Sequence, residues 1–287
     1  MKNTNKRFAA AAAQKGDPYI MMNLSQVRRI VVKVGTSTLT YPTGKLNIRG
    51  IERLVRCIAD LHNRGYDMML VSSGAIGVGA SKLRLPERPT TLRMKQAAAA
   101  VGQCELMHVY DKIFAEYGIS TAQILLTTDD TEDERRRLNV HNTFDALLET
   151  GALPIVNEND TVAVEEIEFG DNDRLAAVVA RVSHADLLVI LTDMDGLFDD
   201  NPRENPEARL IPVVHKITDD LRGIAGGAGT ENGTGGMATK LGAAELCMER
   251  GIPMFVINGA KPETLYEITQ GRLAGTLFLP PEAPDKD

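Results

Sequence analysis

Short runs of apolar residues alternate along the chain with longer stretches in which apolar positions recur at helical spacing. The short runs predict strands at 29–35, 67–73, 121–127, 153–158, 186–193 and 252–258. The longer stretches predict helices at 49–65, 92–118, 133–151 and 173–185, and a weak alternation at 162–170 is compatible with a pair of short strands. Strands rich in valine, isoleucine and leucine that alternate with helices are typical of a largely parallel sheet covered on both faces. We therefore predict an α/β fold.

Polar and glycine-rich segments follow several of the predicted strands. They read KVGTS after the first strand, SSGAIG after the second, NEND after the fourth and TDMDG after the fifth. In open parallel sheets, ligands bind beyond the carboxyl ends of the strands. The pattern therefore predicts a binding site along one edge of the sheet.

The run GTGGMATK at 233–240 has two interpretations. It is not a P-loop, because a P-loop lysine directly follows the last glycine, whereas here three residues separate Gly236 from Lys240. The pattern after Gly236 predicts a helix with Lys240 in its first turn. A lysine there opposes the helix dipole unless an anion is bound beside it, and a phosphate would satisfy both groups. The alternative is a solvated surface loop.

Lys33 lies within an apolar strand, where an unpaired charge is costly to bury. It either reaches solvent at an edge of the sheet or meets an anion in a site. Gly35 would let the backbone approach that anion, and Thr36 and Ser37 would supply hydrogen-bond donors. The SSGAIGVGA segment predicts a second backbone cradle, and it lacks the G-x-S-x-G pattern of a serine nucleophile.

The NEND and GDND segments place carboxylate and amide side chains in two nearby loops. Their members are Asn157, Glu158, Asn159, Asp160, Asp171, Asn172 and Asp173. Either Asp171 or Asp173 is a candidate N-cap for the helix that begins there. Clustered carboxylates repel one another unless a cation lies between them, and a substrate ammonium, a lysine or Mg²⁺ would serve.

Composition and net charge argue against several classes of protein. The 287 residues carry a net charge of −7, which argues against nucleic acid or an anionic membrane as a partner. No apolar run approaches transmembrane length. The three cysteines are isolated and the five histidines form no H-x-x-x-H pair, which argues against a disulfide framework or a zinc site. A cytoplasmic protein is expected.

Seven motifs, taken in their order along the chain, resemble those of a known protein family. VVKVGTSTLT, SSGAIGVG, KQAAAAVGQ, PIVNENDTVA, FGDND, TDMDGLF and GTGGMATK resemble those of the glutamate 5-kinases in the amino acid kinase family. The resemblance implies a three-layer α/β/α sandwich over 28–279, with a glutamate-binding N-terminal lobe and an ATP-binding C-terminal lobe. Residues 1–27 are expected to be a disordered extension and 280–287 a polar tail. Many bacterial members carry a C-terminal PUA domain, an RNA-binding type of module, which this chain is expected to lack.

The same resemblance implies an activity. It is the ATP-dependent phosphorylation of the side-chain carboxylate of L-glutamate to L-glutamyl 5-phosphate, the first step towards proline, with Mg²⁺ accompanying ATP. Lys33 and Lys240 would flank the transferring phosphoryl group, and Asp173 would position both lysines. The implied glutamate-binding residues are Ser73, Asp160 and Asn172, supported by Asn157 and Asp171. The implied ATP-binding residues are Lys33, Thr192, Asp193, Thr234, Gly235, Gly236, Met237, Ala238, Thr239 and Lys240.

Protein partners are also expected, and two alternative functions remain open. A homo-oligomer is expected, and glutamate-5-semialdehyde dehydrogenase is a candidate partner. One alternative is a kinase for another acid, such as N-acetylglutamate or aspartate, although the carboxylates of NEND favour a free ammonium. The other alternative is a nucleotide-binding regulator without catalysis, against which the presence of both Lys33 and Lys240 argues.

Overall fold

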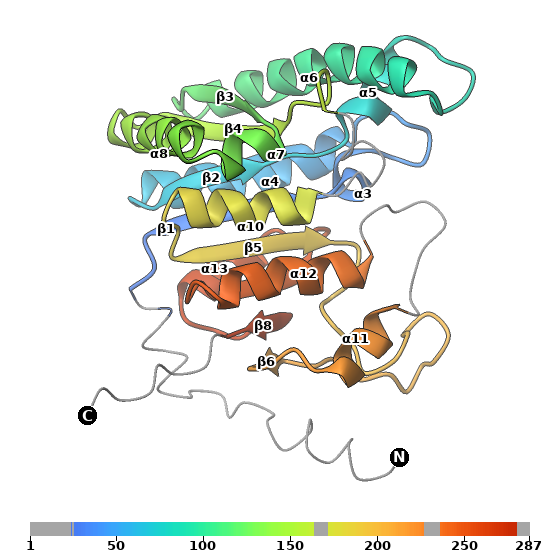
Figure 1. The fold of residues 1–287 in the computed structure, drawn as a ribbon, viewed down its shortest axis with the longest axis vertical. Coiled ribbons are helices and arrows are strands. Elements are labelled where there is room, and N and C mark those ends of the chain that lie inside the picture. Colours follow the sequence, from blue (N-terminus) through green and yellow to red (C-terminus); the bar gives the residue numbers. More distant parts are fainter. Residues whose placement is uncertain (1–23, 25, 164–171, 227–235, 280–287) are drawn as a thin grey trace.

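A central sheet with helices on both faces makes up the computed structural model, which describes residues 24, 26–163, 172–226 and 236–279 (Figure 1). Its strands are β1 (Arg29–Val34), β2 (Asp67–Val71), β3 (Thr121–Leu126), β4 (Leu153–Glu158), β5 (Leu187–Thr192), β6 (Val213–Val214), β7 (Met254–Asn258) and β8 (Thr276–Phe278). Their order across the sheet is β3-β4-β2-β1-β5-β7-β8-β6. Neighbouring strands are parallel except β7 and β8, which pair antiparallel. The predicted α/β class is confirmed.

The strands predicted from the apolar runs are present as β1, β2, β3, β4, β5 and β7, several with shorter ends. Two strands were not predicted. They are β6 and β8, which contain only 2 and 3 residues and are too short to show an alternating pattern. The strand pair considered within 162–170 falls mostly on 164–171, outside the described residues.

The helices form two layers that enclose the sheet. They are α3 (Thr36–Leu39), α4 (Ile48–Asn63), α5 (Ala75–Lys82), α6 (Leu92–Ala115), α7 (Thr128–Glu132), α8 (Glu134–Glu149), α10 (Asn172–Val182), α11 (Asp219–Gly226), α12 (Met237–Met248) and α13 (Thr264–Thr269). Buried residues of α4, α6 and α13 share one hydrophobic core with the sheet. Buried residues of α8, α10 and α12 share the core on the other face (Figure 1).

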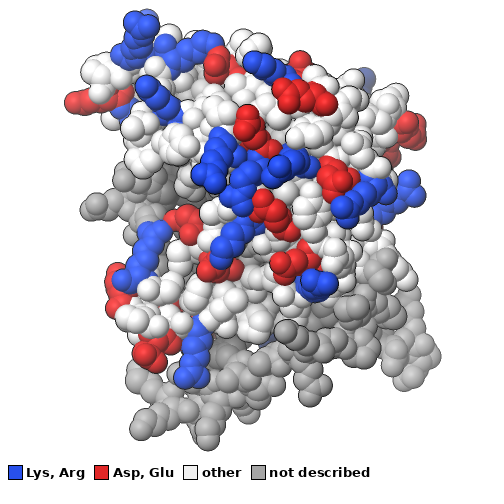
Figure 2. All heavy atoms as spheres, turned by 180° about the vertical axis from the view of Figure 1, so that it is seen from behind, with Lys and Arg blue, Asp and Glu red and all other residues white. Residues whose placement is uncertain are grey.

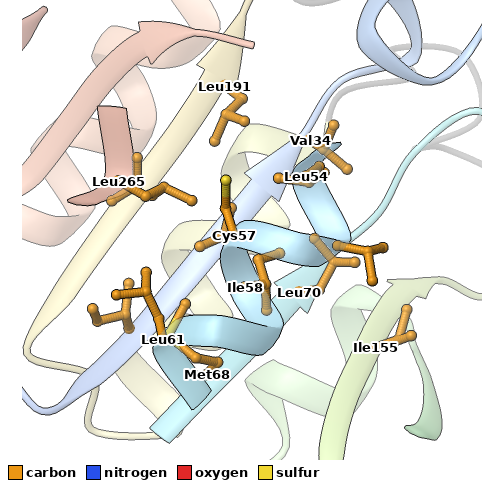
Figure 3. Packing of buried hydrophobic residues seen from close by; sticks show 14 of the residues in the cluster. Val34, Leu54, Cys57, Ile58, Leu61, Met68, Leu70, Ile155, Leu191 and Leu265 are labelled. Atoms are coloured by element: carbon orange, nitrogen blue, oxygen red, sulfur yellow. The ribbon is translucent and has the colours of Figure 1, made fainter. Parts of the chain in front are cut away.

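Helix α4 illustrates how sequence spacing builds the first core. Leu54, Cys57, Ile58 and Leu61 recur at intervals of three and four residues, so they share one face of the helix. That face is buried against the sheet, where Leu70 of β2 lies among the core residues (Figure 3). The polar residues of α4 are thereby left on the outer face.

Successive side chains of β1 enter the two cores alternately. Val32 and Val34 belong to the core of α4, whereas Val31 belongs to the core of α10 and α12. Because side chains two residues apart on a strand point to the same face, Lys33 lies on the face of Val31. The strand therefore directs the lysine toward α10 and α12.

Helices α5 and α6 approach each other unusually closely through glycines. A Cβ atom on Gly79 would lie 1.7 Å from the carbonyl oxygen of Ala98, and one on Gly102 would lie 1.8 Å from that of Ala75. Such distances are possible only without a side chain at these positions. The small residues of both helices, including Ala98 and Ala99 of α6, therefore allow close helix packing.

The surface agrees with the modest net charge. On the face shown in Figure 2, basic and acidic side chains lie interspersed. Among the ion pairs of the described residues, Arg53 donates to both carboxylate oxygens of Glu263, at 3.0 and 2.7 Å. Within the described ranges, none of the helices has the length and apolar character needed to cross a membrane.

Candidate active site

A carboxylate held between two lysines forms the centre of the site. Nζ of Lys33 lies 2.5 Å from Oδ1 of Asp173, and Nζ of Lys240 lies 3.0 Å from Oδ2. Both lysines are only 5% exposed and Asp173 is fully buried. The fold therefore brings together three charged residues from β1, α10 and α12, at the carboxyl end of the sheet.

The ionisation of Asp173 follows from these contacts. Burial by itself raises the pKa of a carboxyl group, but the adjacent ammonium groups of Lys33 and Lys240 outweigh burial and hold the pKa of Asp173 at about 2. Asp173 is thus an anion at neutral pH. The three residues together carry one net positive charge, which suits a site for an anionic ligand.

The first turns of helices α10 and α12 carry the side chains of Asp173 and Lys240. Asp173 lies in the first turn of α10, where the helix dipole favours an anion. Its carboxylate binds the lysines, so the capping role considered for this residue is replaced by an ionic one. Lys240 lies in the first turn of α12, which begins after the extended residue Gly236. Thr239 of the same turn donates a hydrogen bond of 3.2 Å to Oδ2 of Asp173.

Buried amides lie beside this ionic centre. Nδ2 of Asn172 donates to the backbone carbonyl of Ser72 at 2.5 Å and to Oδ1 of Asn157 at 2.7 Å. Nδ2 of Asn157 donates to Oε1 of Gln103 at 2.8 Å. The structure therefore joins Asn157 and Asn172 by a direct hydrogen bond. Gln103 is not among the residues predicted for the site, although it lies in the KQAAAAVGQ motif.

Ser73 and Asp160 occupy the ends of β2 and β4. Ser73 is buried and precedes Gly74, whose φ of 88° is left-handed and turns the chain into α5. Asp160 is half-buried in the turn after β4. Both residues therefore lie at the same edge of the sheet as the lysines. Asp171 lies outside the described residues.

A cavity of about 200 Å³ adjoins the ionic centre on the side of β5 and α12. Thr192, Asp193, Gly236, Met237 and Lys240 are among its lining residues. Lys33, Thr239 and the exposed Ala238 do not line it. Most described residues predicted for the nucleotide side thus share one cavity. Thr234 and Gly235 lie outside the described residues.

Two further residues stabilise the wall of this cavity. Arg203 donates to Asp193 with an Nη2–Oδ2 distance of 2.6 Å, and both side chains are about half exposed. Oγ1 of buried Thr276 accepts a hydrogen bond from the Leu197 N–H at 2.8 Å and donates to the Ile211 carbonyl at 2.7 Å. The role of Thr276 could not be predicted from the sequence, because its partners are distant along the chain.

A larger cavity, of about 460 Å³, lies at the opposite edge of the sheet. It is lined by Ala185 and Pro253, which precede β5 and β7, and by Arg181 near the end of α10. In parallel sheets ligands bind at the carboxyl ends of strands, so the amino-end cavity is not the candidate active site.

The chain matches the model of a known protein family over most of its length. The model of the amino acid kinase family matches residues 28–258. The glutamate 5-kinase of Clostridium acetobutylicum is 56% identical over 257 residues, which cover 90% of this chain and 96% of that protein. The glutamate 5-kinase of Listeria innocua is 51% identical over 260 residues, covering 89% and 94%.

A longer relative shows the same match over part of its length. The glutamate 5-kinase of Caldanaerobacter subterraneus is 55% identical over 256 residues, which cover 89% of this chain and 69% of that protein. The match therefore extends over most of this chain in each of these relatives.

Solved structures show the same fold at low sequence identity. The isopentenyl phosphate kinase of T. acidophilum, a product complex, has a TM-score of 0.59 and 17% identity, covering 87% of this chain and 99% of that one. The UMP kinase of Bacillus anthracis has a TM-score of 0.59 and 16% identity, covering 88% and 96%. The sequence match and the shared fold together show that the chain belongs to the amino acid kinase family.

Proposed function

We propose that this chain is a glutamate 5-kinase, which transfers the γ-phosphoryl group of ATP to the side-chain carboxylate of L-glutamate. The product is L-glutamyl 5-phosphate, and the reaction is the first step of proline biosynthesis. The observation that carries the proposal is the buried Lys33–Asp173–Lys240 bridge. Relatives with 51 to 56% identity that are glutamate 5-kinases support the substrate.

The chemistry fits a site without a general base. A glutamate carboxylate has a reference pKa of about 4.3, so it is already an anion at pH 7 and needs no proton removed. The barrier comes from bringing that anion against the charged γ-phosphate. Buried cations lower this barrier strongly, because charges interact more strongly where water is excluded. Lys33 and Lys240 are placed to supply these cations, and Asp173 keeps both ammonium groups in position.

The two sides of the ionic centre have separate roles in the proposal. The glutamate side consists of Ser73, Asn157, Asp160, Asp171 and Asn172. The nucleotide side consists of the cavity residues Thr192 and Asp193 with the segment 234–240, and Lys240 connects this cavity to the ionic centre. Residues 28–279 thus form one kinase domain with a glutamate lobe and an ATP lobe.

Mg²⁺ is proposed to accompany ATP. The described residues contain no cluster of three or more histidine, cysteine, aspartate or glutamate side chains that could hold a metal ion by themselves. The phosphates of ATP would therefore supply most of the ligands, as is usual for this ion. When bound, Mg²⁺ neutralises charge on the β- and γ-phosphates.

Trapping the acyl phosphate tests the function directly. The purified chain is incubated with ATP, Mg²⁺, hydroxylamine and one of three acids: L-glutamate, N-acetyl-L-glutamate or L-aspartate. We expect hydroxamate from L-glutamate alone. Hydroxamate from N-acetyl-L-glutamate or L-aspartate instead would assign another substrate. No hydroxamate from any acid, with ATP binding intact, would support a regulator without catalysis.

A further inference from the structure

The buried amide of Gln103 connects α6 to the ionic centre. Its Oε1 accepts a hydrogen bond of 2.8 Å from Nδ2 of Asn157. Oδ1 of Asn157 accepts one of 2.7 Å from Nδ2 of Asn172, the residue directly before Asp173. All three amide side chains are buried. They form a continuous hydrogen-bonded chain that ends beside the lysine bridge.

Two backbone groups determine the direction of this chain. The N–H of Glu158, which can only donate, lies 2.9 Å from Oδ1 of Asn157. The carbonyl of Ser72, which can only accept, lies 2.5 Å from Nδ2 of Asn172. Both asparagine amides are thereby oriented. Nδ2 of Asn157 consequently faces Gln103, which has to present its oxygen.

This orientation leaves one acceptor for a ligand. The two hydrogens of Asn172 Nδ2 are used by Ser72 and Asn157, so Oδ1 of Asn172 is directed away from both. No hydrogen bond to this oxygen is found among the described residues. Hydrogen bonds in which one partner is charged are stronger than neutral ones. An amide oxygen of this kind, on a side chain that is 8% exposed, is suited to receive an ammonium group from a ligand.

We propose that Gln103 is a positioning residue that, through Asn157, holds Oδ1 of Asn172 as the acceptor for the α-ammonium group of the substrate. The inference rests on the proposed function, because it requires an amino acid substrate. Gln103 acts at a distance and does not itself contact the substrate. Its loss leaves Nδ2 of Asn157 buried without an acceptor, which displaces the amide chain.

Two substitutions separate this role from general packing. Gln103→Leu has a similar size but no acceptor, whereas Gln103→Glu retains an oxygen for Asn157. The measurements are KM for L-glutamate, KM for ATP and the inhibition constant of glutarate, which has both carboxylates of glutamate but no ammonium group. We expect Gln103→Leu to raise KM for L-glutamate about tenfold and the other two constants less than about twofold. Gln103→Glu should restore most of the affinity.

The outcomes distinguish the inference from the proposed function. A parallel rise of the glutamate and glutarate constants would show a general loosening of the pocket and overturn the inference. An unchanged KM for L-glutamate in Gln103→Leu would overturn it too. If Gln103→Leu does not fold, as judged by circular dichroism, Gln103→Ala removes the same acceptor and is measured in its place. A wild-type chain that makes no acyl phosphate from L-glutamate would overturn the proposed function and the inference together.

Discussion

Nζ of Lys33 lies 2.5 Å from Oδ1 of Asp173, so a cation in an apolar strand is bound to a carboxylate in the first turn of α10. The contact explains how β1 carries a buried charge at acceptable cost, since a buried charge is tolerated when it is paired. The second carboxylate oxygen binds Lys240. Asp173 therefore organises both cations of the proposed phosphoryl-transfer site.

The two lysines provide the most direct test of this arrangement. We expect Lys33→Ala and Lys240→Ala each to lower kcat at least about a hundredfold, because removing one placed electrostatic stabiliser costs about 2.7 to 4 kcal/mol in the barrier. Lys216→Ala is the control, since Lys216 is exposed. Circular dichroism checks the fold of each variant. Near-normal turnover in either lysine variant would contradict the proposed roles.

Because the pKa of Asp173 is lowered in the folded protein, we expect the free energy of unfolding to depend on pH. Its folded-state pKa of about 2 lies below the ordinary value of 3.8, so folding favours the ionised form. The resulting stability, on the order of 2 kcal/mol, is fully present above about pH 4 and is lost as the pH falls through about 2. Asp173→Asn cannot ionise and leaves two buried ammonium groups without their anion, which costs about 3 to 5 kcal/mol at pH 7.

Urea unfolding at pH 7, 4 and 2.5 measures this effect. The stability difference between the wild-type chain and Asp173→Asn should be largest at pH 7 and should shrink at pH 2.5. Asp220→Asn is the control, because Asp220 is exposed on α11. A difference that stays constant across this range would show that Asp173 is not the titrating group.

Thr276 is expected to control the affinity for the nucleotide. Its hydroxyl joins Leu197, which lines the nucleotide-side cavity, to Ile211. Thr276→Val keeps the shape but leaves both backbone groups without this partner, which costs about 1 to 3 kcal/mol each in buried surroundings. We expect KM for ATP to rise severalfold while KM for L-glutamate changes little. Thr276→Ser should behave like the wild-type chain, and equal changes in both KM values would contradict this prediction.

The close contact between α5 and α6 gives a matched pair of glycine substitutions. Gly79→Ala would place a Cβ 1.7 Å from the Ala98 carbonyl, so the helices must separate. We expect a loss of about 1 to 3 kcal/mol or more in the free energy of unfolding. Gly77→Ala on the same helix meets nothing within 4 Å and should be neutral or stabilising by up to about 1 kcal/mol. Thermal unfolding of both variants measures this difference in stability. Similar melting temperatures would argue against the tight contact between α5 and α6.

Much of the architecture was predictable from local pattern. Strand β5 is an almost continuous apolar run, β1 is apolar apart from Arg29 and Lys33, and α4 repeats its apolar residues at helical spacing. These signals are local, because each depends on neighbours within a few residues. The short β6 and β8 carry too few residues for such a signal, and they form because β8 pairs with β7 on one side and with β6 on the other.

The candidate residues of the site could be recognised in the amino-acid sequence. A lysine in an apolar strand, a lysine after a glycine-rich run and clustered carboxylates and amides all point to bound charge. Their combination into one site depends on contacts that form only in the folded chain. Three sets of contacts join residues that are distant along the chain. They are the ion pairs of Asp173 with Lys33 and Lys240, the amide chain from Gln103 to Asn172, and the hydrogen bond between Thr276 and Leu197. Such contacts leave no periodic pattern in the sequence, because they arise when the sheet order brings the carboxyl ends of separate strands together.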